Sequence, residues 1–428
     1  MSSGSPGPRA GPEPGAGALA ARFVAVRALS LAIAAPLSDA DATIQPMPDA
    51  SPAKWHLAHT TWFFETFVLR DHVAGYRAYD ESWAYLFNSY YEAEGERHDR
   101  PRRGMLSRPS LDAVRGYRAA VDDALASALP NLPEEALALV ELGLHHEQQH
   151  QELMLMDLTA TFAENPLRPA VWPAQPPAPA SFPPAAAWTR GREGVVEIGH
   201  AGADFAFDSE GPRHQAVLTP HALADRPVTN ADWLGFIEDG GYADPLLWLS
   251  DGWAWVQREQ VSSPLYWIHG DKGWSRFGLD GLQPLDLAAP VCHVSFYEAD
   301  AFARWAGARL PTEAEWESAA QALDPAAGNQ LDRAGPVRPR PADVLQGALR
   351  QMFGDVWEWT ASPFTSYPGF RPAAGAVGEY NGKFMSGQMV LRGGCCATPR
   401  GHMRASYRNF FYPHQRWMFA GLRLAKDL

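Results

Sequence analysis

The chain has 428 residues, of which 46% are hydrophobic and 20% are charged, so it is long enough to bury two or three hydrophobic cores. Lys and Arg total 36 against 49 Asp and Glu, a formal net charge of −13, and this balance predicts no nucleic-acid partner and no membrane partner. Three cysteines, Cys292, Cys395 and Cys396, make no disulfide framework and suit a reducing compartment, so we expect a cytoplasmic protein with small ligands.

The amino-terminal residues predict a tail followed by a helix. Residues 1–18 are mostly Gly, Pro, Ser and Ala, a composition typical of a disordered segment. The apolar stretch 19–35 that follows contains Arg22 and Arg27. A signal peptide is one explanation, but the stretch starts deep in the chain and is too short to span a bilayer. We therefore expect it to be the first helix of a bundle.

A pattern of four helices covers residues 19–165. The aromatic-rich run 55–59, Trp-His-Leu-Ala-His, predicts the second helix. Ser110 is a start signal for a third helix over 111–128, and the sequence Pro-Glu-Glu at 133–135 starts the fourth. Such a pattern predicts a helical bundle in which facing helices can place polar side chains in the interior.

The rest of the chain has a different texture. Prolines recur from residue 166 to residue 184, which excludes a regular helix and predicts a linker over residues 166–189. Residues 190–428 contain short apolar runs, many glycines and abundant tryptophan, as in an irregular α+β domain. The predicted fold class is therefore a helical bundle followed by an α+β domain.

The fourth helix contains His146-Glu147-Gln148-Gln149-His150. Histidines four residues apart on a helix point to one side, with Cβ atoms about 6 Å apart, and can bind one metal ion. His59 of the second helix is the best candidate for a third ligand. Two alternatives remain open on the residues alone: such histidines are often surface or core residues, and the same five residues spell the zinc-protease pattern in which Glu147 would be the general base.

The second half contains a series of motifs that resembles the formylglycine-generating-enzyme and sulfatase-modifying-factor fold, a loop-rich fold similar to C-type lectins. We expect most of the Trp and Arg side chains in these motifs to be scaffold. A formylglycine-generating enzyme needs two separated copper-binding cysteines, whereas Cys395 and Cys396 are contiguous, so that activity is disfavoured. The motifs are Pro290-Val291-Cys292-His293-Val294-Ser295, the run 307–317, Gly354-Asp355-Val356-Trp357-Glu358-Trp359, Arg392-Gly393-Gly394 and Gly421-Leu422-Arg423.

The helical half, with its two histidine motifs, resembles a DinB-like bundle. The two halves in this order resemble the ergothioneine-biosynthesis sulfoxide synthases and their relatives, the selenoneine synthases, from about residue 20 to the end. The resemblance implies that His59, His146 and His150 bind a non-haem Fe(II). It displaces the zinc-protease alternative, because Glu147 then has no general-base role.

The same resemblance implies the substrates. Hercynine, the trimethyl betaine of histidine, would receive sulfur or selenium at its imidazole C2 in a reaction that consumes O2. Gln149 matches a hydrogen-bond partner of the substrate imidazole, and Asn409 resembles a residue near the betaine. Phe410 and Phe411 are candidates for a cation-π wall around the trimethylammonium group, although such residues often only pack.

Two further sets of residues are candidates by resemblance. Tyr90 and Tyr91 resemble a tyrosine pair that supplies a proton to reduced oxygen, and we favour them over Tyr380. The basic segment 97–108 resembles one whose arginines hold the carboxylates of the donor. Arg103 is a candidate from this segment, but the sequence does not show which of its arginines contacts the donor.

Two departures from the family pattern bear on the donor. Cys395 stands where the family commonly has Ser, and His414 where an acidic residue often stands. They favour the selenoneine branch, whose donor is a selenosugar, over sulfoxide synthases that use cysteine or γ-glutamylcysteine. A third alternative, from another class, is a metal-containing carbohydrate-binding module without catalysis.

Overall fold

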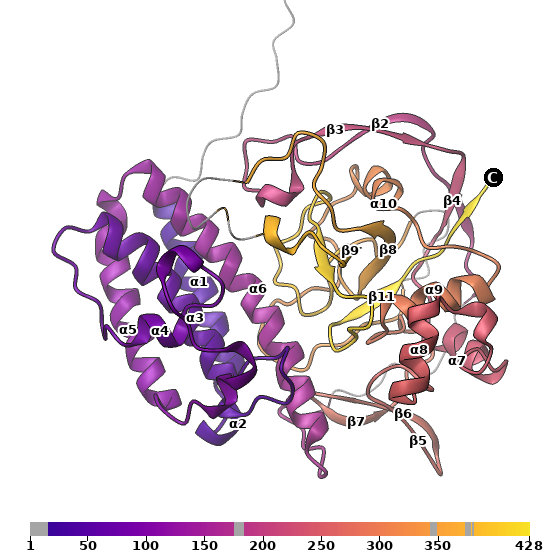
Figure 1. The fold of residues 1–428 in the computed structure, drawn as a ribbon, viewed down its shortest axis with the longest axis horizontal. Helices are drawn as coiled ribbons and strands as arrows, with labels where there is room; N and C mark the ends of the chain where they lie inside the picture. The colour runs from indigo at the N-terminus through magenta and orange to yellow at the C-terminus, as the bar shows by residue number, and fades with distance from the viewer. Residues whose placement is uncertain (1–15, 175–183, 343–348, 373–377, 379–380) are drawn as a thin grey trace, which may run out of the picture.

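The computed structural model describes residues 16–174, 184–342, 349–372, 378 and 381–428, and it has a helical half followed by a half of short strands and helices (Figure 1). This confirms the predicted fold class. The long helices of the first half are α1 (Ala16–Ala34), α3 (Ala53–Phe64), α5 (Leu111–Ala128) and α6 (Glu134–Glu164). Shorter helical segments between them are α2 (Asp39–Thr43), η1 (Glu65–Arg70), α4 (Trp83–Phe87), η2 (Glu92–Glu94), η3 (Arg100–Met105) and η4 (Leu129–Asn131).

Local sequence signals explain where the later bundle helices begin. The Ser110 hydroxyl accepts a hydrogen bond from the backbone N–H of Ala113 at 3.2 Å and caps α5, whose bounds are those predicted. Helix α6 follows Pro133, and its first turn contains Glu134 and Glu135. Negative charge at this end stabilises the helix because the backbone N–H groups there are unpaired.

Helix α1 is long and apolar enough to cross a membrane by composition alone, yet in the structure it packs within the bundle. Phe23 meets Phe64 of α3 edge to face, with ring centroids 5.4 Å apart. Arg27 is buried and forms ion pairs with Asp122 and Glu147 at 2.6 and 2.9 Å. The helix already begins at Ala16, within the segment predicted as a tail, whereas residues 1–15 lie outside the described part of the chain.

The second half is built around a four-stranded sheet in the order β10-β9-β8-β11, in which β8 and β11 are parallel and the other pairs are antiparallel. Its strands are β8 (Trp357–Pro363), β9 (Met389–Arg392), β10 (Asn409–Phe411) and β11 (Ala420–Leu422). Smaller sheets contain β1 (Trp188–Arg190), β4 (His221–Ala224) and β12 (Ala425–Asp427); β2 (Gly194–Ile198) and β3 (His214–Leu218); and β5 (Trp267–Gly270), β6 (Gly273–Gly278) and β7 (Gly281–Pro284).

Helices and turns cover this sheet system. They are η5 (Asp208–Glu210), α7 (Asn230–Glu238), η6 (Pro245–Leu247), α8 (Ser250–Glu259), α9 (Phe296–Trp305), α10 (Glu313–Ala320) and η8 (Gly382–Phe384). Of the predicted linker 166–189, residues 175–183 lie outside the described residues, and β1 begins within its last residues at Trp188. We propose domain boundaries after residues 18, 165 and 189.

The motif arginines of the second half are buried scaffold residues. Arg423 donates to both oxygens of Glu358, at 2.8 and 3.0 Å, and this carboxylate also accepts from the Trp316 indole at 2.7 Å. Arg392 and Arg408 both reach Glu313, each at 2.9 Å. Each buried cation has a carboxylate partner that offsets its desolvation, so these side chains tie loops together.

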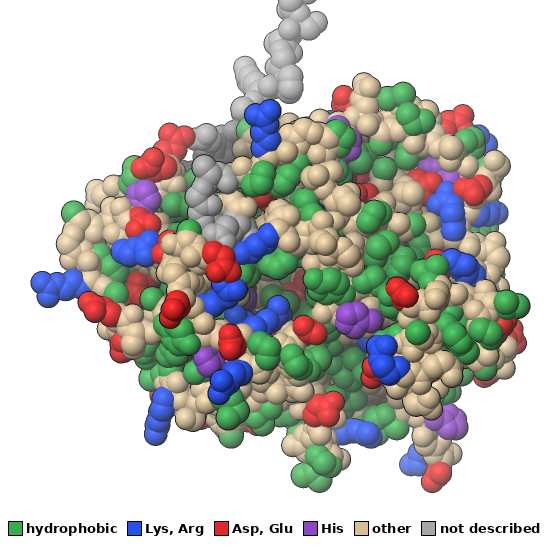
Figure 2. Space-filling view, in the orientation of Figure 1, with side chains coloured by type: hydrophobic (Ala, Val, Ile, Leu, Met, Phe, Trp, Pro, Cys, Tyr) green, Lys and Arg blue, Asp and Glu red, His purple; other side chains and the backbone are tan. Residues whose placement is uncertain are grey.

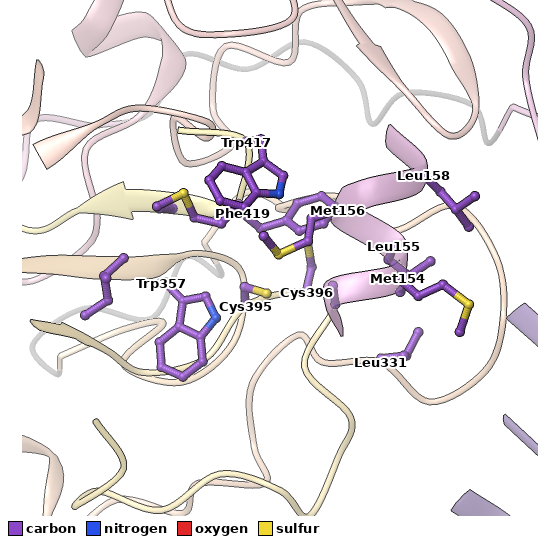
Figure 3. Close-up of a cluster of buried hydrophobic side chains, with 14 of the residues drawn as sticks. Met154, Leu155, Met156, Leu158, Leu331, Trp357, Cys395, Cys396, Trp417 and Phe419 are labelled. Carbon is purple, nitrogen blue, oxygen red and sulfur yellow. The ribbon is translucent and has the colours of Figure 1, made fainter. Parts of the chain in front are cut away.

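Helix α6 lies between the two halves, and tryptophans of the second half donate hydrogen bonds to its polar residues. The Trp357 indole N–H donates to Glu152 at 2.6 Å, and the Trp417 indole N–H donates to Asp157 at 3.0 Å. Figure 3 shows Met156 of α6 beside Trp417, within the apolar cluster at this junction. One side of α6 therefore belongs to the core of the second half.

Candidate metal and substrate site

Three buried histidines meet inside the bundle. His59 lies on α3 and His146 and His150 lie on α6, and their nitrogen ligand atoms are all within 4.8 Å of one another. Helices α3 and α6 pack against each other, so the helical spacing within α6 and the contact between the two helices together create the cluster. The structure thus brings together the three residues predicted from the sequence.

The orientation of His59 fits a metal ligand. Its Nδ1 lies 2.6 Å from the carbonyl oxygen of Phe87, so Nδ1 carries the proton and donates it. Its Nε2 is buried and has no hydrogen-bond partner within the described part of the chain. A buried polar atom without a partner costs free energy, and a metal ion bound to the imidazole lone pair accounts for it.

The three imidazoles are in the form that binds metal. Burial lowers the pKa of His146 to about 3, although the neighbouring Glu147 opposes the shift. Burial, together with the charge of His146, lowers the pKa values of His59 and His150 well below their usual range. Neutral imidazoles in a dry interior are good ligands for Fe(II) and other divalent transition metals, so the donor set fits such an ion.

Glu147 points away from this cluster into the bundle core. Its carboxylate accepts from the Ser30 hydroxyl at 2.5 Å, from Arg27 at 2.9 Å and from Arg118. Burial alone would raise the pKa of Glu147, but the guanidinium groups of Arg118 and Arg27 lower it to about 2. A carboxylate held by two arginines is a structural anion, so the zinc-protease alternative has no general base here.

The tyrosine pair is separated from the histidine cluster by the ring of Trp62. Tyr90 and Tyr91 follow α4 and stack on each other with centroids 4.9 Å apart. Tyr91 is buried and packs against Trp62 at 5.6 Å, and Trp62 stacks on His59 at 5.7 Å. Burial raises the pKa of Tyr90, so its phenol keeps its proton. Tyr380, the alternative proton donor, lies outside the described residues.

Arg103 is the buried arginine of the basic segment 97–108. Its guanidinium lies 3.4 Å over the Trp55 ring and donates to the hydroxyls of Ser51 and Ser89, each at 3.0 Å. Its Nε has no hydrogen-bond partner, and no carboxylate forms a salt bridge with it, among the residues that the structure describes. Burial and the nearby Arg100 lower the pKa of Arg103 well below its usual range, although the charge of Asp157 opposes the shift.

Figure 2 shows basic side chains around a hollow between the helical half and the second half. The other arginines of the basic segment are more exposed than Arg103. Arg97 pairs with Glu92, and exposed Arg100 donates to the carbonyl oxygen of Asp49. The structure therefore separates one interior arginine from several solvated ones.

The candidate hercynine-binding residues come from both halves. The Gln149 amide lies 2.6 Å from the hydroxyl of Tyr407, a residue just before β10. Asn409 and Phe411 share one face of β10, because side chains alternate along a strand. Phe411 packs on Trp417 with centroids 5.5 Å apart, and Phe410 stacks on Phe364 at 4.1 Å on the opposite face. Asn409 and Phe411 therefore lie on the face of β10 that packs against Trp417, which binds Asp157 of α6.

Cys395 and His414 have contacts of another kind. Cys395 is fully buried, and its backbone N–H donates to the Thr398 hydroxyl, which in turn donates to Glu152 at 2.5 Å. Burial and the nearby Glu152 carboxylate raise the pKa of the Cys395 thiol well above its usual range. His414 is exposed and stacks loosely on Tyr412 at 6.2 Å. The contacts of both residues are structural or solvated, and their predicted role near the donor stays a prediction.

The sequence did not single out several residues that surround the cluster. His56, in the same short motif as His59, lies 2.8 Å from His150 and 3.0 Å from Asp157. Tyr407 contacts both Gln149 and His402. The proximity of His56 to His59 on one helix was a usable signal, but the roles of Asp157 and Tyr407 depend on contacts between distant segments.

The fold and the site define a fusion of a DinB-like bundle with a sulfatase-modifying-factor domain. The DinB superfamily model matches residues 22–154, and the model of the sulfatase-modifying factor enzyme 1-like domain matches residues 180–348 and 336–428. The hercynine oxygenase of Mycobacterium tuberculosis is 34% identical over 96% of this chain and 99% of its own length. That of Mycolicibacterium smegmatis is 35% identical over 91% of this chain and 94% of its own. The chain belongs to the ergothioneine-type sulfoxide synthase family, which makes it an oxidoreductase and disfavours the purely carbohydrate-binding alternative.

Proposed function

We propose that this chain is an O2-dependent non-haem iron enzyme that forms a carbon-chalcogen bond at the imidazole C2 of hercynine. The observation that carries the proposal is the buried cluster of three neutral histidines, in which His59 Nε2 has no hydrogen-bond partner in the described part of the chain. Relatives that match nearly the whole chain are named hercynine oxygenases, and this supports hercynine and O2 as substrates. Bound Fe(II) would supply the electron-transfer chemistry that activates O2 and would gather the reactants.

The atoms and electrons of this reaction balance without a further reductant. The C2–H bond of hercynine and the chalcogen–H bond of the donor break, and one carbon-chalcogen bond forms. One oxygen atom of O2 is bonded to the chalcogen, and the other leaves as water with the two released protons. The two substrates together supply the four electrons that O2 requires.

The residues of the chain have separate tasks in this proposal. Gln149 binds the substrate imidazole, and Asn409 with Phe411 contacts the betaine end, because both lie on the β10 face that packs against Trp417. Tyr91, or Tyr90 through it, supplies a proton to reduced oxygen. A phenol suits this task since it delivers a proton without bringing a charge into a buried site.

Arg103 is the residue that we assign to the donor. A buried guanidinium that forms no salt bridge within the described part of the chain can bind an anion, either a chalcogenolate or one carboxylate. γ-Glutamylcysteine carries two carboxylates, whereas the described part of the basic segment offers one buried arginine. This favours a donor with a single anionic group, and the departures from the family pattern at Cys395 and His414 favour a selenosugar. Cysteine remains the alternative, and the names of the relatives favour a sulfur donor.

A metal-binding experiment tests the site. The double variant His146→Ala, His150→Ala should lose one equivalent of tightly bound Fe(II), measured anaerobically by equilibrium dialysis and metal analysis. The matched control is His293→Ala, which removes a buried histidine of the second half. An intact iron site in the double variant would refute the assignment.

A donor competition tests the reaction. Purified iron-loaded protein receives hercynine and O2 with a selenosugar, cysteine or γ-glutamylcysteine, and product is followed by mass spectrometry. We expect O2 consumption only with all components present and a higher kcat/KM for the selenosugar. Faster turnover of either thiol would assign a sulfur donor instead.

The double substitution Tyr90→Phe and Tyr91→Phe tests the proton donor. It should slow product formation while hercynine affinity is kept, and full activity of that double variant would exclude both tyrosines.

The place of the reaction follows from the donor chemistry. Selenolates and thiolates are oxidised in secretory compartments, and the three cysteines of this chain are free and buried. We therefore propose a cytoplasmic enzyme, which a fluorescent fusion in the source cell can check.

A further inference from the structure

A hydrogen-bonded chain leads from His150 to a carboxylate that the second half helps to hold. His150 Nδ1 lies 2.8 Å from His56 Nδ1, and His56 Nε2 lies 3.0 Å from Asp157 Oδ2. Asp157 also accepts from the backbone N–H of Ser51 at 2.8 Å and from the Trp417 indole at 3.0 Å. His56 and Asp157 are both almost fully buried.

The direction of each hydrogen bond follows from the groups at the end of the chain. An ionised carboxylate only accepts, so His56 Nε2 carries a proton and donates it to Asp157. A neutral His56 then has a lone pair on Nδ1, and this lone pair accepts the proton on Nδ1 of His150. In this tautomer His150 has its own lone pair on Nε2.

The same outcome is reached at His59 by a shorter path, because its Nδ1–H donates directly to the Phe87 carbonyl oxygen. Two of the three candidate ligands therefore present an unprotonated Nε2 to the metal. For His59 the backbone acceptor Phe87 sets this tautomer, and for His150 the side chains of His56 and Asp157 set it. Free imidazoles populate both neutral tautomers, so a site that selects one tautomer in advance binds a metal more tightly.

We propose that His56 and Asp157 are positioning residues that select the Nδ1–H tautomer of His150 and aim its Nε2 at the metal. The proposal rests on the metal site of the proposed function. It extends that site by two side chains, and it attaches the site through Trp417 to the second half of the protein.

The substitutions His56→Leu and His56→Gln separate this role from simple packing. Leucine fills space but offers no acceptor to His150, whereas the glutamine carbonyl can accept from His150 Nδ1 while its amide donates to Asp157. We expect His56→Leu to weaken metal binding by about 10- to 100-fold and His56→Gln to stay within a few-fold of wild type. His293→Leu, which removes a buried histidine elsewhere, is the control and should keep wild-type affinity.

Two measurements decide the matter. Anaerobic titration of the metal-free protein with Co(II), followed by its visible absorption bands, gives the dissociation constants. Long-range proton-nitrogen NMR of histidine-labelled metal-free protein, at about pH 8, reports the tautomer of His150 directly. We expect the Nδ1–H form in wild type and His56→Gln, and a mixture in His56→Leu.

The contrary outcomes are distinct. An Nε2–H tautomer of His150 in wild type, or equal metal affinity in the leucine and glutamine variants, would overturn the relay while leaving the metal site in place. Wild-type protein that binds no Co(II) or Fe(II) would overturn the proposed function and the relay with it. If His56→Leu does not fold, as judged by far-UV circular dichroism, the wild-type tautomer and the affinity of His56→Gln still decide the outcome.

Discussion

Truncation of Glu147 should destabilise the bundle strongly. The carboxylate is fully buried and accepts from Ser30, Arg27 and Arg118. After Glu147→Ala, Arg27 keeps an ion pair with Asp122 at 2.6 Å, but Arg118 keeps only hydroxyl and carbonyl partners. The change therefore leaves the buried guanidinium of Arg118 without a hydrogen-bonded carboxylate, which costs about 3–5 kcal/mol of unfolding free energy.

The assay is urea unfolding of the metal-free protein, followed by circular dichroism at 222 nm, where the bundle helices dominate the signal. Metal must be absent because a bound ion would add its own stabilisation. The matched control is Asp122→Ala, which removes the other carboxylate partner of Arg27. That side chain is a quarter exposed and Arg27 keeps Glu147, so we expect a loss of about 1 kcal/mol. Equal losses in the two variants, or a loss below about 1 kcal/mol for Glu147→Ala, would refute the argument.

Three further outcomes can be checked. Tyr407→Phe should raise the dissociation constant of hercynine about 5- to 10-fold in calorimetric titrations, because one hydrogen bond to the substrate-binding amide is lost. Burial lowers the pKa of His293 from 6.5 to about 3, so the unfolded chain binds one more proton and stability falls as pH drops from about 6.5 towards 3. His293→Gln should flatten that dependence by about 1.4 kcal/mol per pH unit in urea melts. Gly143→Ala should cost about 1–2 kcal/mol in the same melts, since its Cβ would lie 2.5 Å from a ring carbon of Phe64, and overpacking outweighs the gain in helix propensity.

Features of the fold that depend on local sequence could be predicted. The third helix has its predicted bounds, Leu111–Ala128, because its signals are local in sequence: Ser110 caps its first turn, and the apolar residues recur with helical periodicity along it. The histidine pair on α6 was readable for the same reason. The π-helical segment η1 was not predicted, since its stability comes from distant partners: Glu65 accepts from Tyr76 at 2.9 Å and from Tyr117 at 2.5 Å.

The surroundings of the candidate site were harder to predict than its ligands. Asp157 lies 101 residues from His56 along the chain, and Tyr407 lies 258 residues from Gln149. No helical or strand periodicity connects such positions, so only the packing of the two halves brings them together. Arg103 is a similar case, because its burial depends on Trp55 and two serines from separate segments.

Helix α6 has 31 residues and is therefore about 46 Å long, and its middle turns hold two of the candidate ligands. The same turns carry Gln149, Glu152 and Asp157, which bind side chains of the second half. A rigid rod anchored in both halves cannot act as a hinge between them without displacing the ligands. A crosslink between the two halves should therefore leave turnover intact.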